Sequence, residues 1–290
     1  MQITLNIATS FSVFLLIALS FSIVYFTTKK FHIAHAAVIT LSAFFAYLFI
    51  KQVVLPFSLS ITLALLFATI LGILSGYPLY VTLQKRKSPT FVFLIASLGI
   101  YIILQNLISI IWGDEAKSIN IEPVKEGIIF FGGNITKIQI MTIMVSLFSL
   151  LAWLLYSNRS NLGRQIRAVS SNDELAKILG IKSKVIVLLS FTIGSVLAAV
   201  TGILVALNTN ITPTMGFNLL LYGIVAMIIG GVGSTWGLIG GSLLLATAQH
   251  LSVYYIGNKW MDVIVYIILI LFLIWKPLGF SGKRLKKIEI

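Results

Sequence analysis

The residues of this sequence that could do chemistry are a few polar side chains set inside long apolar runs. His35 and His250 each lie in such a run, and Gln105 and Asn106 are neighbours late in another. Ionisable and amide groups are costly in hydrocarbon and usually face a cavity or a partner. We therefore predict that His35, His250 and at most one of the two amides, which point to different helix faces, line a path for a polar solute. For both histidines a purely structural role is an equally open alternative.

Catalytic patterns are absent from the sequence. It contains no HExxH and no G-x-S-x-G, and its eight acidic residues lie mainly in loops. There are no cysteines, so neither disulfides nor thiolate ligands are expected. We predict that the chain is not an enzyme and holds neither a metal nor a cofactor of its own.

A glycine-rich run spans residues 230–241 and reads GGVGSTWGLIGG. It lacks the Lys-Ser/Thr pair that a phosphate loop requires. Gly233, Gly237 and Gly241 instead recur every four residues, the spacing that lets membrane helices approach closely. We assign these three glycines and Gly230 to helix packing, or alternatively to the hinge of a helix–turn–helix.

Composition places most of the chain in lipid. Hydrophobic residues make up 58% of it and charged residues 10%, with a mean hydropathy of +1.03. We predict an all-α integral membrane protein, a polytopic helical bundle forming one domain over residues 1–290. About nine spans are expected, within a range of eight to ten, at residues 5–28, 31–50, 57–83, 90–112, 138–156, 185–207, 218–233, 237–255 and 261–275.

The net charge of +13 is distributed by side of the membrane rather than as a nucleic-acid patch. Loops on one side carry 16 lysines and arginines against three acids, whereas those on the other side carry five of each sign. Cytoplasmic loops are enriched in Lys and Arg. The N-terminus is therefore predicted outside and the C-terminus in the cytoplasm, and no nucleic-acid partner is expected.

Two polar segments interrupt the apolar runs, residues 113–137 outside the membrane and residues 157–184 in the cytoplasm. In the second segment, Ser171 and Glu174 have the spacing of a helix capping box, and Gly180 stands where a left-handed C-terminal cap belongs. Between them the sequence predicts a short helix with one apolar stripe, formed by Leu175, Ile178 and Leu179. Such a stripe in water requires a docking partner, or alternatively an anionic lipid surface.

Four stretches, taken in order, resemble ABC-transporter permeases of the high-affinity branched-chain amino acid type, and more distantly sugar permeases. The cytoplasmic segment contains LGRQIRAVSSNDELAKILGI, which is similar to that family's cytoplasmic loop. The other three stretches are FHIAHAAVITLSAFFAY, SLGIYIILQN and AMIIGGVGSTWGLIGGSLL. Together they extend from the early part of the chain to its C-terminal part.

The resemblance implies a permease subunit of an importer in the bacterial inner membrane. Two permease subunits, here expected to be different chains by analogy, would form the path, and a periplasmic or tethered binding protein would deliver substrate. Cytoplasmic ATPase subunits would bind ATP and magnesium. The ATPase-coupling residues of the family map onto Gly163, Arg164, Arg167, Ala168, Glu174, Ala176, Gly180 and Ile181, which gives the stripe of Leu175, Ile178 and Leu179 a partner.

The sequence departs from the family pattern at positions expected to face the path or to pack helices together. His32 stands where the family usually has Asn, and Gln249 where it often has an acidic residue. We add Gln249 to the predicted path. Branched-chain or other neutral amino acids are the first expectation for the substrate, with urea, short amides or a sugar as alternatives. A stand-alone secondary carrier or channel is the alternative of a different class, although the sequence shows neither its inverted repeats nor its paired midplane charges.

Overall fold

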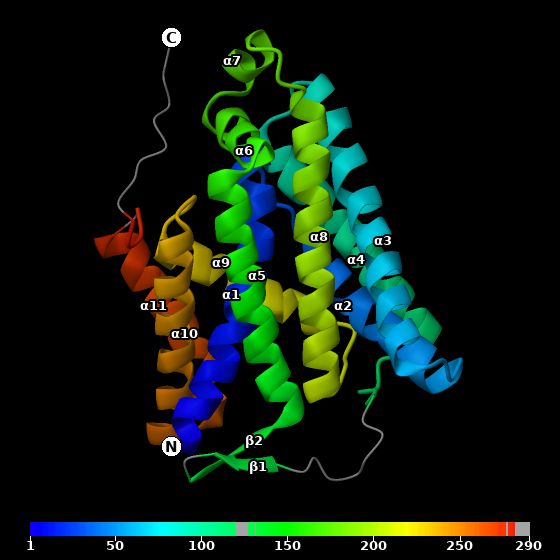
Figure 1. Ribbon diagram of the computed structural model, residues 1–290, viewed down its shortest axis with the longest axis vertical. Helices are drawn as coiled ribbons and strands as arrows, with labels where there is room; N and C mark the ends of the chain where they lie inside the picture. Colours follow the sequence, from blue (N-terminus) through cyan, green and yellow to red (C-terminus); the bar gives the residue numbers. More distant parts are fainter. Residues whose placement is uncertain (120–126, 131, 277, 282–290) are drawn as a thin grey trace.

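The computed structural model describes residues 1–119, 127–130, 132–276 and 278–281 and is mostly helical (Figure 1). Within these ranges, 7 helices are long and apolar enough to cross a membrane. They are α1 (Gln2–Thr28), α2 (His35–Tyr47) with its π-helical extension η1 (Leu48–Gln52), α3 (Phe57–Lys85), α4 (Thr90–Trp112), α5 (Lys137–Arg159), α8 (Ser183–Asn208), and the 3-10 turn η2 (Asn258–Trp260) with α11 (Met261–Trp275).

Each of the nine predicted spans coincides with one helix, but two helices fall outside the group of 7. α9 (Met215–Gly230) has 16 residues, or about 24 Å at 1.5 Å per residue, which is short of a hydrocarbon core of about 30 Å. α10 (Thr235–Tyr255) is long enough, but its glycines, Gln249 and His250 lower its hydropathy. The structure therefore supports a multi-span helical bundle, and the count of nine stays a prediction.

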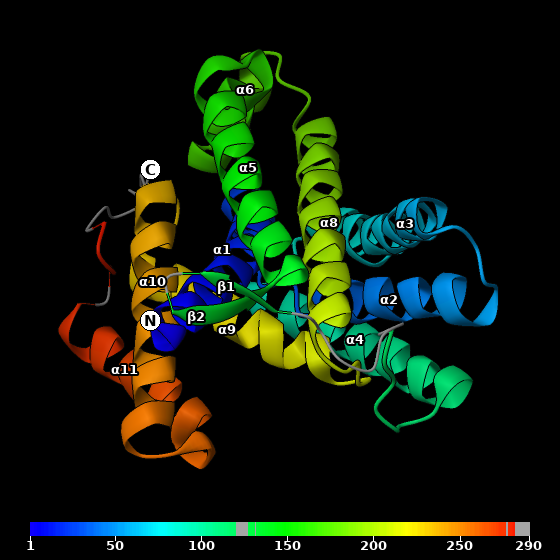
Figure 2. The ribbon, with the colours of Figure 1, turned by 60° about the horizontal axis from the view of Figure 1, so that its bottom comes forward.

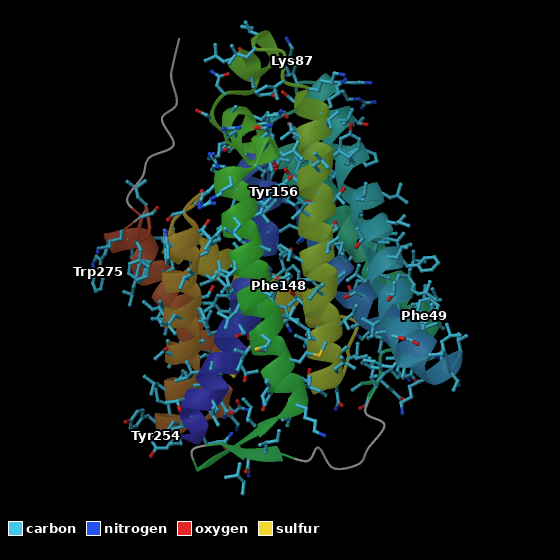
Figure 3. All side chains as sticks on the ribbon, viewed as in Figure 1. Phe49, Lys87, Phe148, Tyr156, Tyr254 and Trp275 are labelled. Atoms are coloured by element: carbon cyan, nitrogen blue, oxygen red, sulfur yellow. The ribbon has the colours of Figure 1, made fainter. Side chains whose placement is uncertain are left out.

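α1 is the central helix of the bundle. Figure 2 shows α10 and α11 on one flank of it and α2, α3 and α4 on the other. In its most apolar 18-residue stretch 72% of residues are buried, whereas for α11 the share is 6%. Peripheral helices project large apolar side chains outward, among them Phe148 on α5 and Trp275 on α11 (Figure 3). Such outward apolar faces are what a hydrocarbon solvent permits.

Small residues let the helices around α1 approach one another closely. A Cβ added at Gly202 of α8 would lie 2.1 Å from the Ile39 carbonyl oxygen of α2. At the crossing of α9 and α10, a Cβ on Gly237 would lie 1.9 Å from the Gly230 carbonyl oxygen, and one on Gly241 2.2 Å from that of Ala226. Gly233 differs, because it lies in the turn between these helices at a φ of 87°.

The end of the bundle that holds the N-terminus also holds a small β-hairpin, which the sequence does not predict. Strands β1 (Gly127–Phe130) and β2 (Gly133–Thr136) pair antiparallel. Gln2 binds the backbone of Asn134 through both amide atoms, at 2.8 and 3.0 Å. Part of the predicted outer segment 113–137 therefore covers the start of α1, while residues 120–126 and 131 lie outside the described residues.

The opposite end carries two short helices, α6 (Asn161–Ser171) and α7 (Asp173–Ile178). They connect α5 to α8 and extend beyond the bundle (Figure 1). Lys87, after the end of α3, lies at this same end, and Tyr254 lies at the other (Figure 3). Four of the 16 basic residues on the predicted cytoplasmic side, at positions 283, 284, 286 and 287, lie outside the described residues.

Candidate functional site

A tight corner between α5 and α6 fixes where the polar segment leaves the bundle. The Ser160 hydroxyl accepts a hydrogen bond from the Gly163 amide at 2.8 Å and so caps α6. A Cβ on Gly163 would lie 2.4 Å from the Ser157 carbonyl oxygen, so only glycine fits here without a backbone shift. Gly163 is therefore a structural requirement of the corner.

Helix α7 is capped at both ends, but its first cap is one residue later than predicted. The Asn172 side chain accepts from the amides of Glu174 and Leu175 at 3.0 and 3.1 Å. Ser171 is the last residue of α6, so the expected Ser171–Glu174 capping box does not form. The single asparagine satisfies two donors at the start of α7.

The C-terminal end of α7 forms the predicted left-handed cap. Gly180 has a φ of 81°, its amide donates to the Lys177 carbonyl at 3.0 Å, and the Ile181 amide donates to the Ala176 carbonyl at 2.9 Å. These two bonds are those of a Schellman motif. The motif turns the chain sharply towards α8.

The two faces of α7 differ in exposure. Leu175, Ile178 and Leu179 are 50%, 79% and 77% exposed. Ala176, in contrast, is buried in a small core with Ile166, Val169 and Ile186, which belong to α6 and α8. The loop is therefore anchored to the bundle on one side and presents an apolar stripe on the other.

The charged residues of this loop lie on its surface. Arg164 donates to the Asn161 side chain, and Arg167 donates to the backbone and hydroxyl oxygens of Ser157. Both arginines and Glu174 are exposed, whereas Ala168 and Ile181 are half-buried. The guanidinium groups of Arg164 and Arg167 are thus exposed on the loop, next to the α5–α6 corner.

We expect Asn172→Ala to loosen α7 without unfolding the bundle. Loss of an N-cap side chain costs about 1 kcal/mol, and a helix of 6 residues has little else to stabilise its first turn. Amide hydrogen exchange at Glu174 and Leu175 should accelerate about fivefold. Ser171→Ala is the control, because exchange should stay unchanged if Asn172 is the cap. Faster amide exchange in the Ser171→Ala variant but not in the Asn172→Ala variant would show that Ser171 caps α7, as the sequence predicts, and would contradict this structure.

Of the predicted path residues, His35 is completely enclosed. Its Nε2 lies 2.6 Å from the Ser20 hydroxyl of α1, which also donates to the Gly194 carbonyl of α8 at 2.8 Å. A hydroxyl whose proton is used in this way accepts from Nε2–H, which assigns the tautomer. Both ring nitrogens of the adjacent His32, also buried, have no hydrogen-bond partner in the described structure. Ser20 is a partner that sequence reasoning missed, because a serine inside an apolar run has no distinctive spacing.

Gln249 and His250 lie on α10, against α1 and α9. The Ser10 hydroxyl is 2.8 Å from Nε2 of His250. The Gln249 amide is buried close to the Tyr222 hydroxyl but makes no bond of normal geometry. That hydroxyl instead donates to Asp262 of α11. Polar side chains thus lie at the contacts between α1 and α10 and between α9 and α11.

The two amides of α4 face different directions, as their adjacency in the sequence predicts. Gln105 is half-buried, whereas Asn106 is exposed and donates to the Ile102 carbonyl at 2.8 Å. α4 and α10 lie on opposite flanks of the bundle (Figures 1 and 2). The five predicted path residues therefore do not converge on one site within the described part of this chain.

Known proteins are similar to this chain over nearly its whole length. The family described as "Branched-chain amino acid transport system / permease component" matches residues 3–274. The chain is 29% identical to the high-affinity branched-chain amino acid transport system permease protein BraD of Pseudomonas aeruginosa, over 98% of this chain and 96% of the relative. It is 27% identical, with the same coverage, to the corresponding permease protein LivH of Escherichia coli.

Other similarities are weaker or concern the fold alone. The xylose transport system permease protein XylH of Haemophilus influenzae is 31% identical over 33% of this chain and 28% of the relative. Among solved structures, "PsaBC from Streptococcus pneumoniae in complex with Fab" matches with a TM-score of 0.54 at 14% identity, covering 96% of this chain and 93% of that chain. The near-complete family match, on a helical bundle with an exposed loop helix, establishes that this chain belongs to the family of branched-chain amino acid transport system permease components.

Proposed function

We propose that this chain is the permease subunit of an ABC importer that moves branched-chain or other neutral amino acids across the bacterial inner membrane. The observation that carries this proposal is the exposed apolar stripe on α7, in a chain of this permease family. A capped, anchored helix with three exposed apolar side chains fits a groove on a partner protein. In this assembly the ATP and magnesium belong to the partner ATPase.

The anchoring of α7 supplies the mechanical link. Ala176 packs against Ile186 of α8, and the α5–α6 corner at Gly163 continues directly into α5. A displacement of α7 by a closing ATPase would therefore act on α5 and α8 together. α8 packs against α1, so such a movement reaches the centre of the bundle, as expected for alternating access driven by sliding of packed helices.

We further propose nine spans, with the N-terminus outside and α6 and α7 in the cytoplasm. The charge asymmetry of the loops supports this orientation. A second permease, expected to be a different chain, would complete the path, and a periplasmic or tethered binding protein would deliver the substrate. His35, Gln249, His250, Gln105 and Asn106 remain proposed path residues, at separate places in this chain rather than at one site.

Reconstitution tests the substrate. The chain would be placed in proteoliposomes with its co-purified ATPase, second permease and binding protein, and uptake of labelled leucine would be measured with ATP inside. We expect ATP-dependent uptake that unlabelled isoleucine and valine inhibit, while urea and xylose do not. Inhibition by xylose or urea but not by valine would reject the amino acid assignment.

A further inference from the structure

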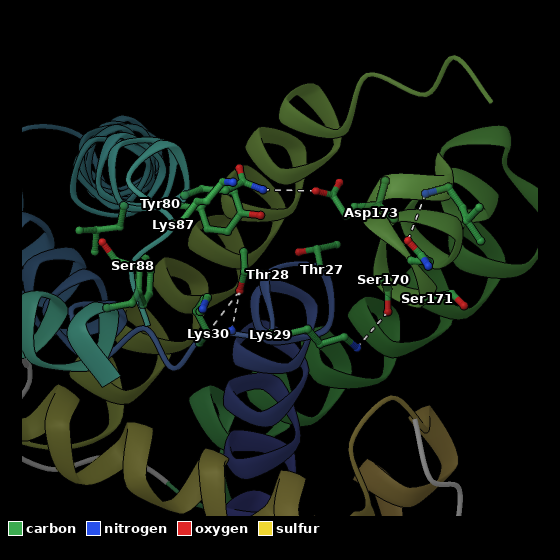
Figure 4. A pocket seen from close by; sticks show the side chains of 16 residues that line it. Thr27, Thr28, Lys29, Lys30, Tyr80, Lys87, Ser88, Ser170, Ser171 and Asp173 are labelled. Carbon is green, nitrogen blue, oxygen red and sulfur yellow. Dashed lines mark hydrogen bonds between the residues drawn. The ribbon is translucent and has the colours of Figure 1, made fainter. Parts of the chain in front are cut away.

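A cavity of about 880 Å³ lies at the end of the bundle that carries α6 and α7 (Figure 4). The turn after α1, the end of α3, the start of α4 and the joint between α6 and α7 enclose it. Its lining residues are Thr27, Thr28, Lys29, Lys30, Tyr80, Leu83, Gln84, Lys87, Ser88, Phe93, Val169, Ser170, Ser171, Asn172, Asp173 and Leu175. This volume lies in the range of small-molecule sites.

The charge of this cavity is strongly positive. Lys29, Lys30 and Lys87 line it, and in the described part of the chain none of them forms an ion pair. Asp173, its acidic residue, is already paired with Lys177 at 2.6 Å. The pocket thus gathers three ammonium groups, contributed by two separate turns, against the single carboxylate of Asp173, which already accepts hydrogen bonds from Lys177 and Gln84.

Two of the lysines are held in place by hydroxyl groups rather than by acids. Lys29 Nζ donates to Ser170 Oγ at 3.2 Å, and Lys30 Nζ donates to Thr90 Oγ1 at 2.7 Å. Burial lowers the pKa of Lys29 to about 8, since no anion compensates for its lost hydration. An anion in the cavity would supply the missing counter-charge.

The remaining lining indicates the kind of anion. Hydroxyls of Ser88 and Ser171 can donate to the oxygens of a phosphate, and lysine binds phosphate as a point charge. Leu83 and Phe93 provide an apolar wall, so the phosphate would carry an organic group. Basic pockets between membrane helices at the cytoplasmic end characteristically receive phosphate head groups.

We propose that this cavity is a binding site for a phosphate-bearing organic anion, either the head group of an anionic phospholipid or a soluble phosphate ester. The ligand would connect Lys29 and Lys30 at the end of α1 with Ser170 and Ser171 at the α6–α7 joint. An occupied cavity would therefore hold the loop helices against the bundle. This binding does not depend on which solute is transported.

The test measures thermal unfolding of the purified full-length chain in nanodiscs. One arm compares phosphatidylglycerol with phosphatidylcholine nanodiscs, and the other adds inorganic phosphate to phosphatidylcholine nanodiscs at constant ionic strength. We expect a higher unfolding temperature in at least one arm. Stabilisation by phosphatidylglycerol alone identifies a lipid head group, whereas stabilisation by phosphate identifies a soluble ligand.

Variants separate a built site from general surface charge. Lys29→Met/Lys30→Met should weaken binding at least about tenfold, because two charge-assisted contacts are lost. Lys85→Met/Arg86→Met removes the same charge from exposed positions at the end of α3 that do not line the cavity, and should bind normally. Lys87→Met removes the third lysine of the cavity. Because Lys87 is exposed, this variant should fold normally and bind the anion more weakly.

Two results would overturn the proposal. The first is the absence of stabilisation of the unmodified chain in both arms. The second is equal loss of binding in the Lys29/Lys30 and Lys85/Arg86 variants, which would reduce the effect to surface charge. Because transport is not measured, either result leaves the proposed import function untouched.

Discussion

Replacing Leu175 and Ile178 of α7 by aspartate is expected to abolish ATP-driven uptake while the permease remains folded and inserted. Both side chains are at least half exposed, so the substitutions should change the free energy of unfolding by no more than about 0.5 kcal/mol each. As central contacts in a partner groove, each would contribute about 2 kcal/mol to binding. Together they should weaken ATPase binding about a thousandfold.

The matched control changes the net charge of the same loop by the same amount. Lys182→Gln/Lys184→Gln changes the charge of the loop by the same two units at two exposed residues outside the apolar stripe and the coupling residues, and should retain uptake. Co-purification of the ATPase and leucine uptake are measured for both double variants, together with the amount of protein in the membrane. Full uptake in the Leu175/Ile178 variant at normal protein levels would contradict the docking role of α7.

Gly237→Ala is expected to destabilise the fold more than its size suggests. The added methyl would lie 1.9 Å from the Gly230 carbonyl oxygen, so α9 and α10 would have to separate. Overpacking of this kind costs about 1–3 kcal/mol, and here the clashing atom belongs to the backbone and cannot rotate away. The thermal unfolding temperature should fall by about 3–10 °C.

Gly240→Ala on the same helix provides the comparison. Its added Cβ would come no closer than 3.5 Å to the Phe280 ring, an ordinary van der Waals contact. Because alanine favours helix by about 1 kcal/mol over glycine, this variant should be neutral or slightly stabilised. Equal unfolding temperatures for the two variants would show that the helices do not meet at Gly237.

Hydropathy located the membrane helices but not their places in the bundle. The most apolar 18-residue stretches of α1 and α4 are about equally hydrophobic, yet 72% of the residues in the first and 22% in the second are buried. Lipid and protein interior are equally apolar, so hydrophobicity cannot distinguish a central helix from a peripheral one. Buried small and polar residues such as Ser12 and Ser20 mark α1 as central, and they become informative only once their neighbours are known.

The loop was predictable in type and less so in detail. The apolar stripe and the Gly180 cap follow from spacing that depends only on local geometry. The sequence predicts Ser171 as the N-cap of α7, whereas the structure has Asn172. Both residues are good caps. Because α6 continues through Ser171, Asn172 is the residue left to cap α7. Sequence spacing contains no signal for that continuation.

The basic cavity could not be predicted, because its residues come from distant parts of the chain. Lys29 and Ser170 are 141 positions apart and meet only through the packing of α1 against the loop helices. In the sequence, the same lysines contribute to the charge asymmetry and to nothing more local. Their shared location depends on tertiary structure.

The central claim is that an ATPase acting on α7 powers transport through this chain. The most direct measurement compares leucine uptake into proteoliposomes that hold the complete complex with uptake into proteoliposomes that hold this chain alone. Both are supplied with ATP and, separately, with sodium or proton gradients. Uptake only by the complete complex, and only with ATP, is the predicted result. Gradient-driven uptake by this chain alone would identify a secondary carrier and contradict the account.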